Sequence, residues 1–133
     1  MATIKRFEDI EAWQKARTLA NEIHLISINS ELATDFRLKD QINASAGSAM
    51  DNIAEGFERG GKLEFINFLS IAKGSAGEVK SQLYRLSDRK YINNEKFEEL
   101  YKLSNDICNM IGAWINYLNK SGIKGTKFKD RVT

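Results

Sequence analysis

The sequence predicts an all-α fold, an up-down-up-down antiparallel four-helix bundle. Three observations indicate it: apolar residues recur every three or four positions in four long segments, no segment alternates with the period of a strand, and the chain contains no proline. Because proline interrupts helix interiors, its absence permits long unbroken helices. With 133 residues, 42% of them hydrophobic, the chain has the size and composition of one domain around one core.

The first helix is expected over about residues 7–28. Six apolar residues share one helical face because they are spaced by three or four positions. They are Ile10, Trp13, Ala16, Leu19, Ile23 and Ile26. Asn29 and Ser30 then interrupt the apolar pattern, and we expect the helix to end there.

The second helix is expected to begin after Thr34 or Asp35. Either side chain has an oxygen that can accept a hydrogen bond from a first-turn N–H group and so cap the helix. The apolar and small residues of its inner face follow at helical spacing: Leu38, Ile42, Ser45, Ala49 and Ile53. We expect this helix to end near Gly60 and Gly61.

The third and fourth helices carry the most regular patterns. In the third, apolar positions alternate in steps of four and three over three heptads: Phe65, Leu69, Ala72, Ala76, Val79, Leu83 and Leu86. The pattern breaks around residues 91–94, where Asn93 or Asn94 can cap the fourth helix. The fourth helix repeats the spacing with Phe97, Leu100, Ser104, Ile107, Ile111, Trp114 and Leu118. Gly122 and Gly125 are expected to end it.

Further apolar residues lie beside these two seams. They are Leu63, Ile66 and Ile71 in the third helix, and Leu103, Met110 and Tyr117 in the fourth. They indicate either a thick core within one bundle or a second surface that packs between subunits.

The chain divides into a single helical domain over residues 1–121 and a basic tail over residues 122–133 that is expected to be flexible. Five basic residues against one acidic residue give residues 120–133 a net charge of +4, whereas residues 1–119 carry −2. Because nucleic-acid-binding proteins present basic surfaces, RNA binding by this chain requires local clusters of cations or the tail.

Glycine and alanine are concentrated on both sides of Gly60 and Gly61. If the chain reverses there, antiparallel partners have residue numbers that sum to 121, and Gly47 faces Gly74. Small residues in register allow two helix backbones to approach closely. The pattern therefore predicts a tight contact between the second and third helices at these glycines.

Residues 56–63 read Gly-Phe-Glu-Arg-Gly-Gly-Lys-Leu, which is close to a phosphate-binding loop. That loop requires Ser or Thr after Lys62 to hold magnesium, and it follows a strand. Here Leu63 takes that position and a helix precedes the loop. We interpret the segment as a structural turn.

The sequence lacks the residue patterns of the catalytic centres that helical bundles are known to hold. His24 is the only histidine and has no glutamate three residues before it, which argues against the di-iron sites of helical bundles. Cys108 is the only cysteine and is expected to be a small core residue. The sequence shows no signal peptide or membrane-length apolar run. We therefore predict a cytoplasmic protein that is not an enzyme and needs no cofactor or metal.

Seven basic residues are the predicted nucleic-acid-binding residues. Folding the chain at Gly60 places five of them at one end of the bundle: Arg37, Lys39, Arg85, Arg89 and Lys90. The other two, Arg59 and Lys62, lie at the opposite end with Lys5, Arg6 and the tail. Such clusters can neutralise phosphates. Alternatively, cations at the end of a helix complement its dipole.

Two polar rows accompany these cations. Asn52, Glu55 and Arg59 share one face of the second helix, and Ser75, Glu78 and Gln82 repeat the spacing on the third. The rows form either a satisfied polar network beside the helix contact or a surface that binds a ligand or RNA.

The residue pattern resembles the 23S rRNA intervening-sequence proteins over roughly residues 7–118. The matching stretches are Phe7-Glu8-Asp9-Ile10, Trp13-Gln14-Lys15-Ala16, Gln41-Ile42, Asn52-Ile53-Ala54-Glu55-Gly56 with Arg59, Phe65, Phe68-Leu69, Ile71-Ala72, Gly74-Ser75 and Glu78. Two departures are Asn43-Ala44, where the family often has a basic pair, and Gly77 in an alanine-rich step.

The resemblance implies a helical bundle that assembles into a ring, a homopentamer. It also implies similarity to the accessory variability determinant of diversity-generating retroelements, a pentamer that binds nucleic acid and a reverse transcriptase. Two functions are consistent with it. One is an oligomer that binds RNA or a ribonucleoprotein through its basic ends, and the other is a protein-interaction scaffold without nucleic-acid affinity.

Overall fold

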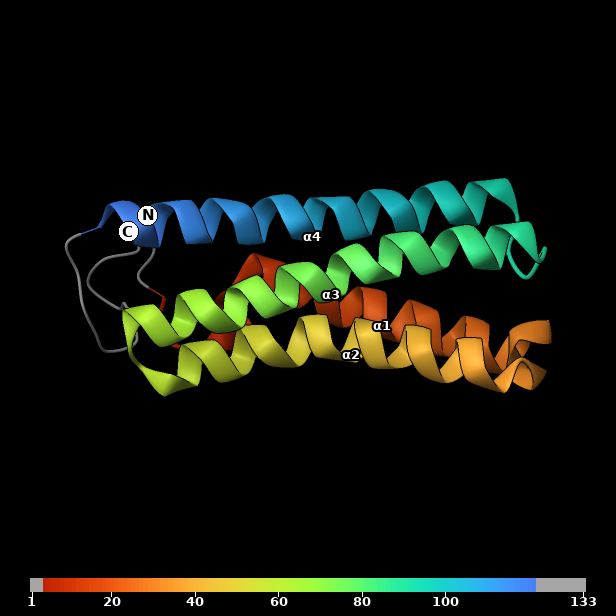
Figure 1. Ribbon diagram of the computed structural model, residues 1–133, viewed down its shortest axis with the longest axis horizontal. Helices are drawn as coiled ribbons and strands as arrows, with labels where there is room; N and C mark the ends of the chain where they lie inside the picture. The colour runs from red at the N-terminus through yellow and green to blue at the C-terminus, as the bar shows by residue number, and fades with distance from the viewer. Residues whose placement is uncertain (1–3, 122–133) are drawn as a thin grey trace.

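The computed structural model describes residues 4–121 and confirms the all-α four-helix bundle (Figure 1). Its long helices are α1 (Glu11–Asn29), α2 (Phe36–Arg59), α3 (Lys62–Asp88) and α4 (Asn94–Lys120), with short 3-10 helices η1 (Phe7–Asp9) and η2 (Glu31–Thr34). Consecutive helices pack side by side, and α1 closes the bundle against α4. No strand occurs in residues 4–121.

The core is built from the apolar faces that the sequence predicts. All seven seam residues of α3 are fully buried. The ring of Phe65 packs edge-on against the ring of Phe57 from α2, and its centroid lies 5.5 Å from that of the Trp114 ring from α4. Ser104 is the polar member of the α4 seam, and its buried hydroxyl donates to the Leu100 carbonyl at 2.8 Å. Cys108 is buried, as expected.

The helix ends agree with the expected boundaries within a few residues. Residues 7–9 form η1, so α1 begins only at Glu11, and it ends at Asn29. Asn93 caps α4 as predicted, because its Oδ1 accepts from the Lys96 N–H at 2.8 Å. Asp35 precedes α2, but its carboxylate makes no capping bond. Gly122, Gly125 and the predicted tail lie outside the described residues.

Gly60 makes the turn between α2 and α3. Its φ of +83° lies in the left-handed region, which residues that carry a Cβ rarely adopt. Its N–H donates to the Phe57 carbonyl at 3.2 Å and so closes the last turn of α2. The turn joins two helices and not a strand to a helix, in agreement with the structural interpretation of residues 56–63.

The predicted close contact at Gly47 and Gly74 is wrong. A Cβ added at either glycine would have no heavy atom within 4 Å. The tight position is Gly56, where an added Cβ would lie 2.6 Å from the Phe68 Cβ. The hydroxyls of Ser48 and Ser75 lie 2.8 Å apart, so α2 and α3 are antiparallel in nearly the expected register. Residue spacing predicted the pairing, but it did not determine which side of each helix faces the partner.

Two further properties concern the described residues. No helix in residues 4–121 combines the length and the apolar character needed to cross a bilayer. The same residues hold no group of three or more His, Cys, Asp or Glu side chains placed to bind a metal ion.

Candidate nucleic-acid interface

A polar groove of about 450 Å³ runs along the outer side of α2 and α3. Four residues of each helix line it: Gln41, Ala44, Ser45 and Ser48 from α2, and Ser75, Glu78, Gln82 and Arg85 from α3. The predicted polar row of α3 thus lies in this groove. We call it the α2–α3 groove.

Serine and asparagine side chains hold the middle of the groove together. The Ser48 and Ser75 hydroxyls share a hydrogen bond of 2.8 Å, and Asn52 Nδ2 donates to the Ser48 hydroxyl and carbonyl at 2.9 Å each. Asn52 therefore belongs to a satisfied network, as one of the two interpretations of its row predicts.

Gln82 is the exception among these polar groups. The residue is only 7% exposed, and its Oε1 is buried without a hydrogen-bond partner in the structure. Native proteins leave few buried polar atoms unpaired. The sequence placed Gln82 on the polar row but carried no signal that its amide would lie buried.

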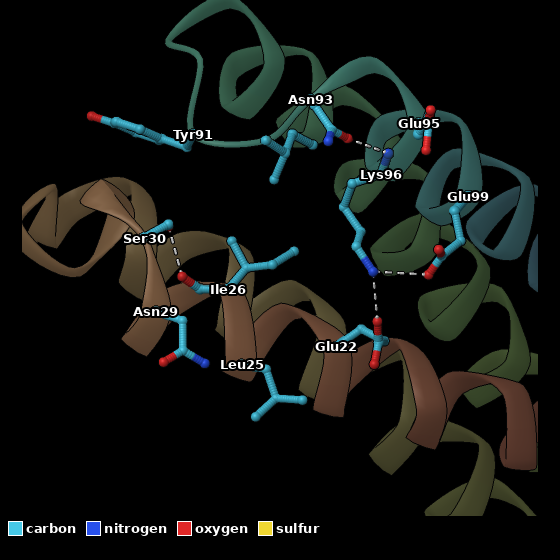
Figure 2. Close-up of a pocket in the computed structure, with 11 residues that line it drawn as sticks. Glu22, Leu25, Ile26, Asn29, Ser30, Tyr91, Asn93, Glu95, Lys96 and Glu99 are labelled. Carbon is cyan, nitrogen blue, oxygen red and sulfur yellow. Dashed lines mark hydrogen bonds and ion pairs between the residues drawn. The ribbon is translucent and has the colours of Figure 1, made fainter.

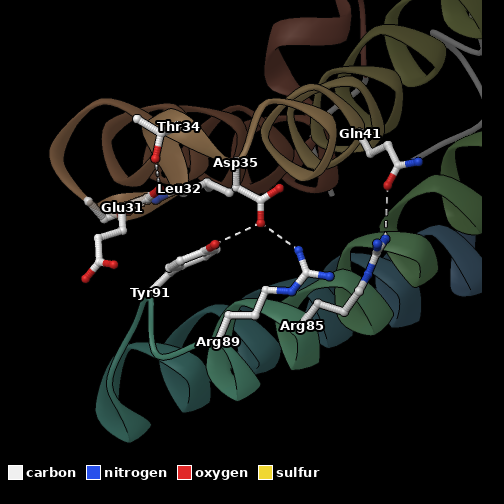
Figure 3. A network of polar contacts seen from close by, with 9 residues as sticks. Glu31, Leu32, Thr34, Asp35, Gln41, Arg85, Arg89 and Tyr91 are labelled. Carbon is white, nitrogen blue, oxygen red and sulfur yellow. Dashed lines mark hydrogen bonds and ion pairs between the residues drawn. The ribbon is translucent and has the colours of Figure 1, made fainter.

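At one end of the groove, Asp35, which lies between η2 and α2, contacts residues from the end of α3 and from the connection between α3 and α4 (Figure 3). Its carboxylate accepts from Arg89 at 2.6 Å and from the Tyr91 hydroxyl at 2.8 Å. The hydrogen bond from Tyr91, followed by that from Arg89, holds the pKa of Asp35 below its ordinary value. The same bond to Asp35 raises the pKa of Tyr91, because it stabilises the protonated phenol. Arg89 is thus neutralised within the fold.

The other four predicted cations at this end have no ion pair in residues 4–121. Arg85 donates to the neutral Gln41 amide at 3.2 Å (Figure 3). The Lys39 Nζ lies 3.5 Å from the Ala33 carbonyl oxygen and 5.3 Å from the centre of the Phe36 ring. Arg37 and Lys90 are exposed. We call Arg37, Lys39, Arg85 and Lys90 the basic end.

The two remaining predicted residues lie at the opposite end and have partners. Arg59 pairs with Glu55 at 2.7 Å and with Glu64 at 3.7 Å, which raises the pKa of its guanidinium, chiefly through Glu55. Its guanidinium carbon also lies 5.0 Å from the centre of the Phe68 ring. Lys62 Nζ donates to a backbone carbonyl, that of Ser121, at 2.9 Å. The structure therefore divides the seven predicted cations between two ends, as expected, but engages Arg59 and Lys62 in the fold.

A second hollow, of about 620 Å³, lies where α1 ends and α4 begins (Figure 2). Lys96 Nζ bridges Glu22 and Glu99 there, at 3.2 Å from each carboxylate. The hydrogen bond that Lys96 donates to Glu99, then the one it donates to Glu22, raises the pKa of Lys96, and its amine is protonated at neutral pH. A protonated amine is not a nucleophile. Sequence reasoning missed this group, because no local pattern signals a contact between residues 22 and 96.

The fold and these contacts define a class: an antiparallel four-helix bundle with a polar groove between two helices and unneutralised cations at one end. The chain belongs to the 23S rRNA-intervening sequence protein family, which matches residues 8–113.

Among solved structures, the chain is similar to a protein of unknown function from the S23 ribosomal protein family of Bacteroides thetaiotaomicron. The two are 26% identical with a TM-score of 0.68, over 79% of this chain and 95% of the other. A comparison with curated proteins finds no match.

Proposed function

We propose that this protein is a non-enzymatic homo-oligomer that binds RNA, or a ribonucleoprotein, through the basic end. The observation that carries the proposal is the lack of ion pairs in residues 4–121 for the four cations of that end. Salt bridges engage other cations of the chain, such as Arg6, Arg59 and Lys102. Cations left without acidic partners at one end of the bundle are available to phosphates.

The ion pair at Asp35 supports this use of the surface. It ties the end of α3 to the start of α2, and so supports the contact between Arg85 of α3 and Gln41 of α2. Three of the four cations, Arg37, Lys39 and Arg85, are then presented from two helices that this contact holds together, and Lys90 lies two residues after the end of α3. Binding loses less conformational entropy when the charged groups are already held in place.

The expected signature of RNA binding is a steep dependence on salt. Each phosphate that a protein neutralises contributes about 0.7 to the slope of log affinity against log salt for single strands. Replacing all four cations of the basic end by glutamine should therefore lower the slope by about 2 to 3. The measurement is fluorescence anisotropy of a labelled single-stranded RNA titrated with intact protein between about 50 and 200 mM salt.

A matched control variant separates position from total charge. It replaces four exposed or half-exposed cations that have no ion pair in residues 4–121 and lie in neither predicted cluster, namely Lys15, Arg17, Lys73 and Lys80. The control should keep most of the salt slope. Equal losses in both variants would contradict binding at the basic end, and no RNA binding by the intact protein at about 50 mM salt would overturn RNA binding altogether.

The outer face of α3 supports self-association. Leu63 and Ile71 are 73% and 52% exposed, and Gly74 between the ends of the helix is open to solvent. Exposed apolar side chains beside a glycine offer a surface on which another helix can pack closely. We propose that a second copy covers this face in the pentameric ring that the family resemblance implies.

The alternative function, a protein-interaction scaffold, is favoured by the same apolar face of α3. Light scattering with the parent and an Ile71→Glu variant tests the assembly. The parent should scatter as a multiple of 15.1 kDa and the variant as smaller species. A parent of 15.1 kDa at micromolar concentration would contradict self-association, whereas an oligomer without RNA affinity would establish the scaffold.

A further inference from the structure

We propose that the α2–α3 groove binds a single guanine base through Gln82, Glu78 and Arg85. This inference rests on the proposed RNA binding and names the part of the RNA that the protein reads. The base is supplied either by a single-stranded segment of RNA or by a free guanine nucleotide.

The first observation is the unpartnered acceptor in the groove. Gln82 is 93% buried, its Oε1 has no hydrogen-bond donor in the structure, and its side chain lines the groove. A buried acceptor without a donor destabilises the folded protein. Because Oε1 is itself buried, the terminal amide of Gln82 must first turn toward the groove, where an N–H group of a ligand would then satisfy this acceptor.

The neighbours of Gln82 supply a second acceptor and a donor. Glu78 lies one helical turn before Gln82 on the same face, is exposed, and has no ion pair in residues 4–121. Arg85 lies three residues after Gln82, and only one of its nitrogens is used, toward Gln41. A guanidinium carries five N–H donors, so further donors remain for a ligand.

This set of groups is complementary to one base edge. Guanine presents two adjacent donors, N1–H and the N2 amino group, beside one acceptor, O6. The Watson–Crick edge of adenine offers a single donor group, and that of uracil places one donor between two acceptors. A cationic ligand would satisfy the two acceptors of the groove but would be repelled by Arg85.

The shape of the groove also suits a planar base. Its α2 wall is formed by the small side chains of Ala44, Ser45 and Ser48, which leave the helix surface open to a flat ring. Its volume of about 450 Å³ falls within the range of small-molecule sites.

The test compares three single-stranded RNA oligonucleotides with uridine throughout and guanine, inosine or adenine at one central position. Inosine retains N1–H and O6 but lacks the N2 amino group. Anisotropy titrations with the intact protein should show the guanine RNA binding roughly tenfold tighter than the adenine RNA, with inosine between them. Titration with guanosine monophosphate alone then establishes whether a free nucleotide suffices.

Two variants connect the preference to the groove. Gln82→Met and Glu78→Ala should each remove the difference in affinity between the guanine and adenine RNAs. Glu98→Ala, at an exposed glutamate of α4 that lies outside the groove, is the matched control and should keep the preference. Because Gln82→Met also removes a buried unpaired acceptor, its melting temperature should equal or exceed that of the parent.

The outcomes separate this proposal from RNA binding itself. Equal affinity for the guanine and adenine RNAs would overturn the guanine site and leave salt-dependent RNA binding intact. Binding of guanosine monophosphate that Gln82→Met abolishes, without any binding of RNA, would support the base site and overturn the RNA function. A lower melting temperature for Gln82→Met would show that Gln82 is already paired in the fold, and would contradict the proposal.

Discussion

The Asp35 carboxylate accepts a 2.6 Å hydrogen bond from Arg89, a residue 54 positions later in the chain. This single contact joins the residue that precedes α2 to the residue that follows α3. Tyr91 donates to the same carboxylate oxygen at 2.8 Å. One acidic side chain therefore holds the start of α2 and the end of α3 together, next to the basic end.

Acid should weaken the fold through Asp35. Its pKa in the folded protein lies below its ordinary value of 3.8, so the unfolded chain binds more protons as the pH falls through this range. The stabilisation by Asp35 is therefore present above about pH 4 and is lost as the pH falls toward its folded pKa. Asp35→Asn should be less stable than the parent near neutral pH and should lose less stability on acidification. Urea melts at several pH values measure this, and parallel pH profiles would contradict it.

Gly56 and Gly74 should respond oppositely to the same substitution. A methyl group at Gly56 meets the Phe68 Cβ, and overpacking a core costs about 1–3 kcal/mol of unfolding free energy. A methyl group at Gly74 meets open solvent, and alanine in a helix is about 0.5–1 kcal/mol more favourable than glycine. Denaturant melts of Gly56→Ala and Gly74→Ala measure both effects. Two equal midpoints would show that Gly56 does not lie closer to a neighbouring helix than Gly74 does.

Gly60 and Gly61 form a second matched pair, this time at the turn. Gly60→Ala forces a side chain into the left-handed region at φ +83°, which costs about 1–2 kcal/mol. Gly61 has an ordinary φ of −98°, and a Cβ there meets only the flexible end of Glu64, at 2.8 Å. Gly61→Ala should accordingly cost less than Gly60→Ala in thermal melts. An equal loss would indicate that backbone conformation is not what selects glycine at residue 60.

Lys96 should react slowly with amine-directed acylating reagents near neutral pH. The hydrogen bonds to Glu99 and Glu22 raise its pKa, and only the unprotonated amine reacts. Lys90 is the reference, because it is exposed and has no ion pair in residues 4–121. Mass spectrometry of proteolytic peptides over a time course gives both rates. Labelling of Lys96 as fast as Lys90 would mean that the bridge to the two carboxylates is not populated.

Local chemistry determined most of the helical architecture. The apolar spacing predicted the buried face of each helix, as the fully buried seam of α3 shows. Side-chain chemistry predicted the Asn93 cap, and the glycine pair predicted the reversal at Gly60. These features depend on residues within one or two helical turns of each other, and such residues lie close together in the sequence.

The tertiary structure alone decided how the helices turn toward one another. The orientation of α2 about its own axis decides which of its glycines faces α3, which is why Gly56 and not Gly47 meets a neighbour. The packing of the helices also buries the Gln82 Oε1 without a hydrogen-bond partner. It places Arg89 where its guanidinium donates to the Asp35 carboxylate, which makes no capping bond to α2. Spacing within one helix carries no information about such contacts, because they depend on side chains from several helices packing at once.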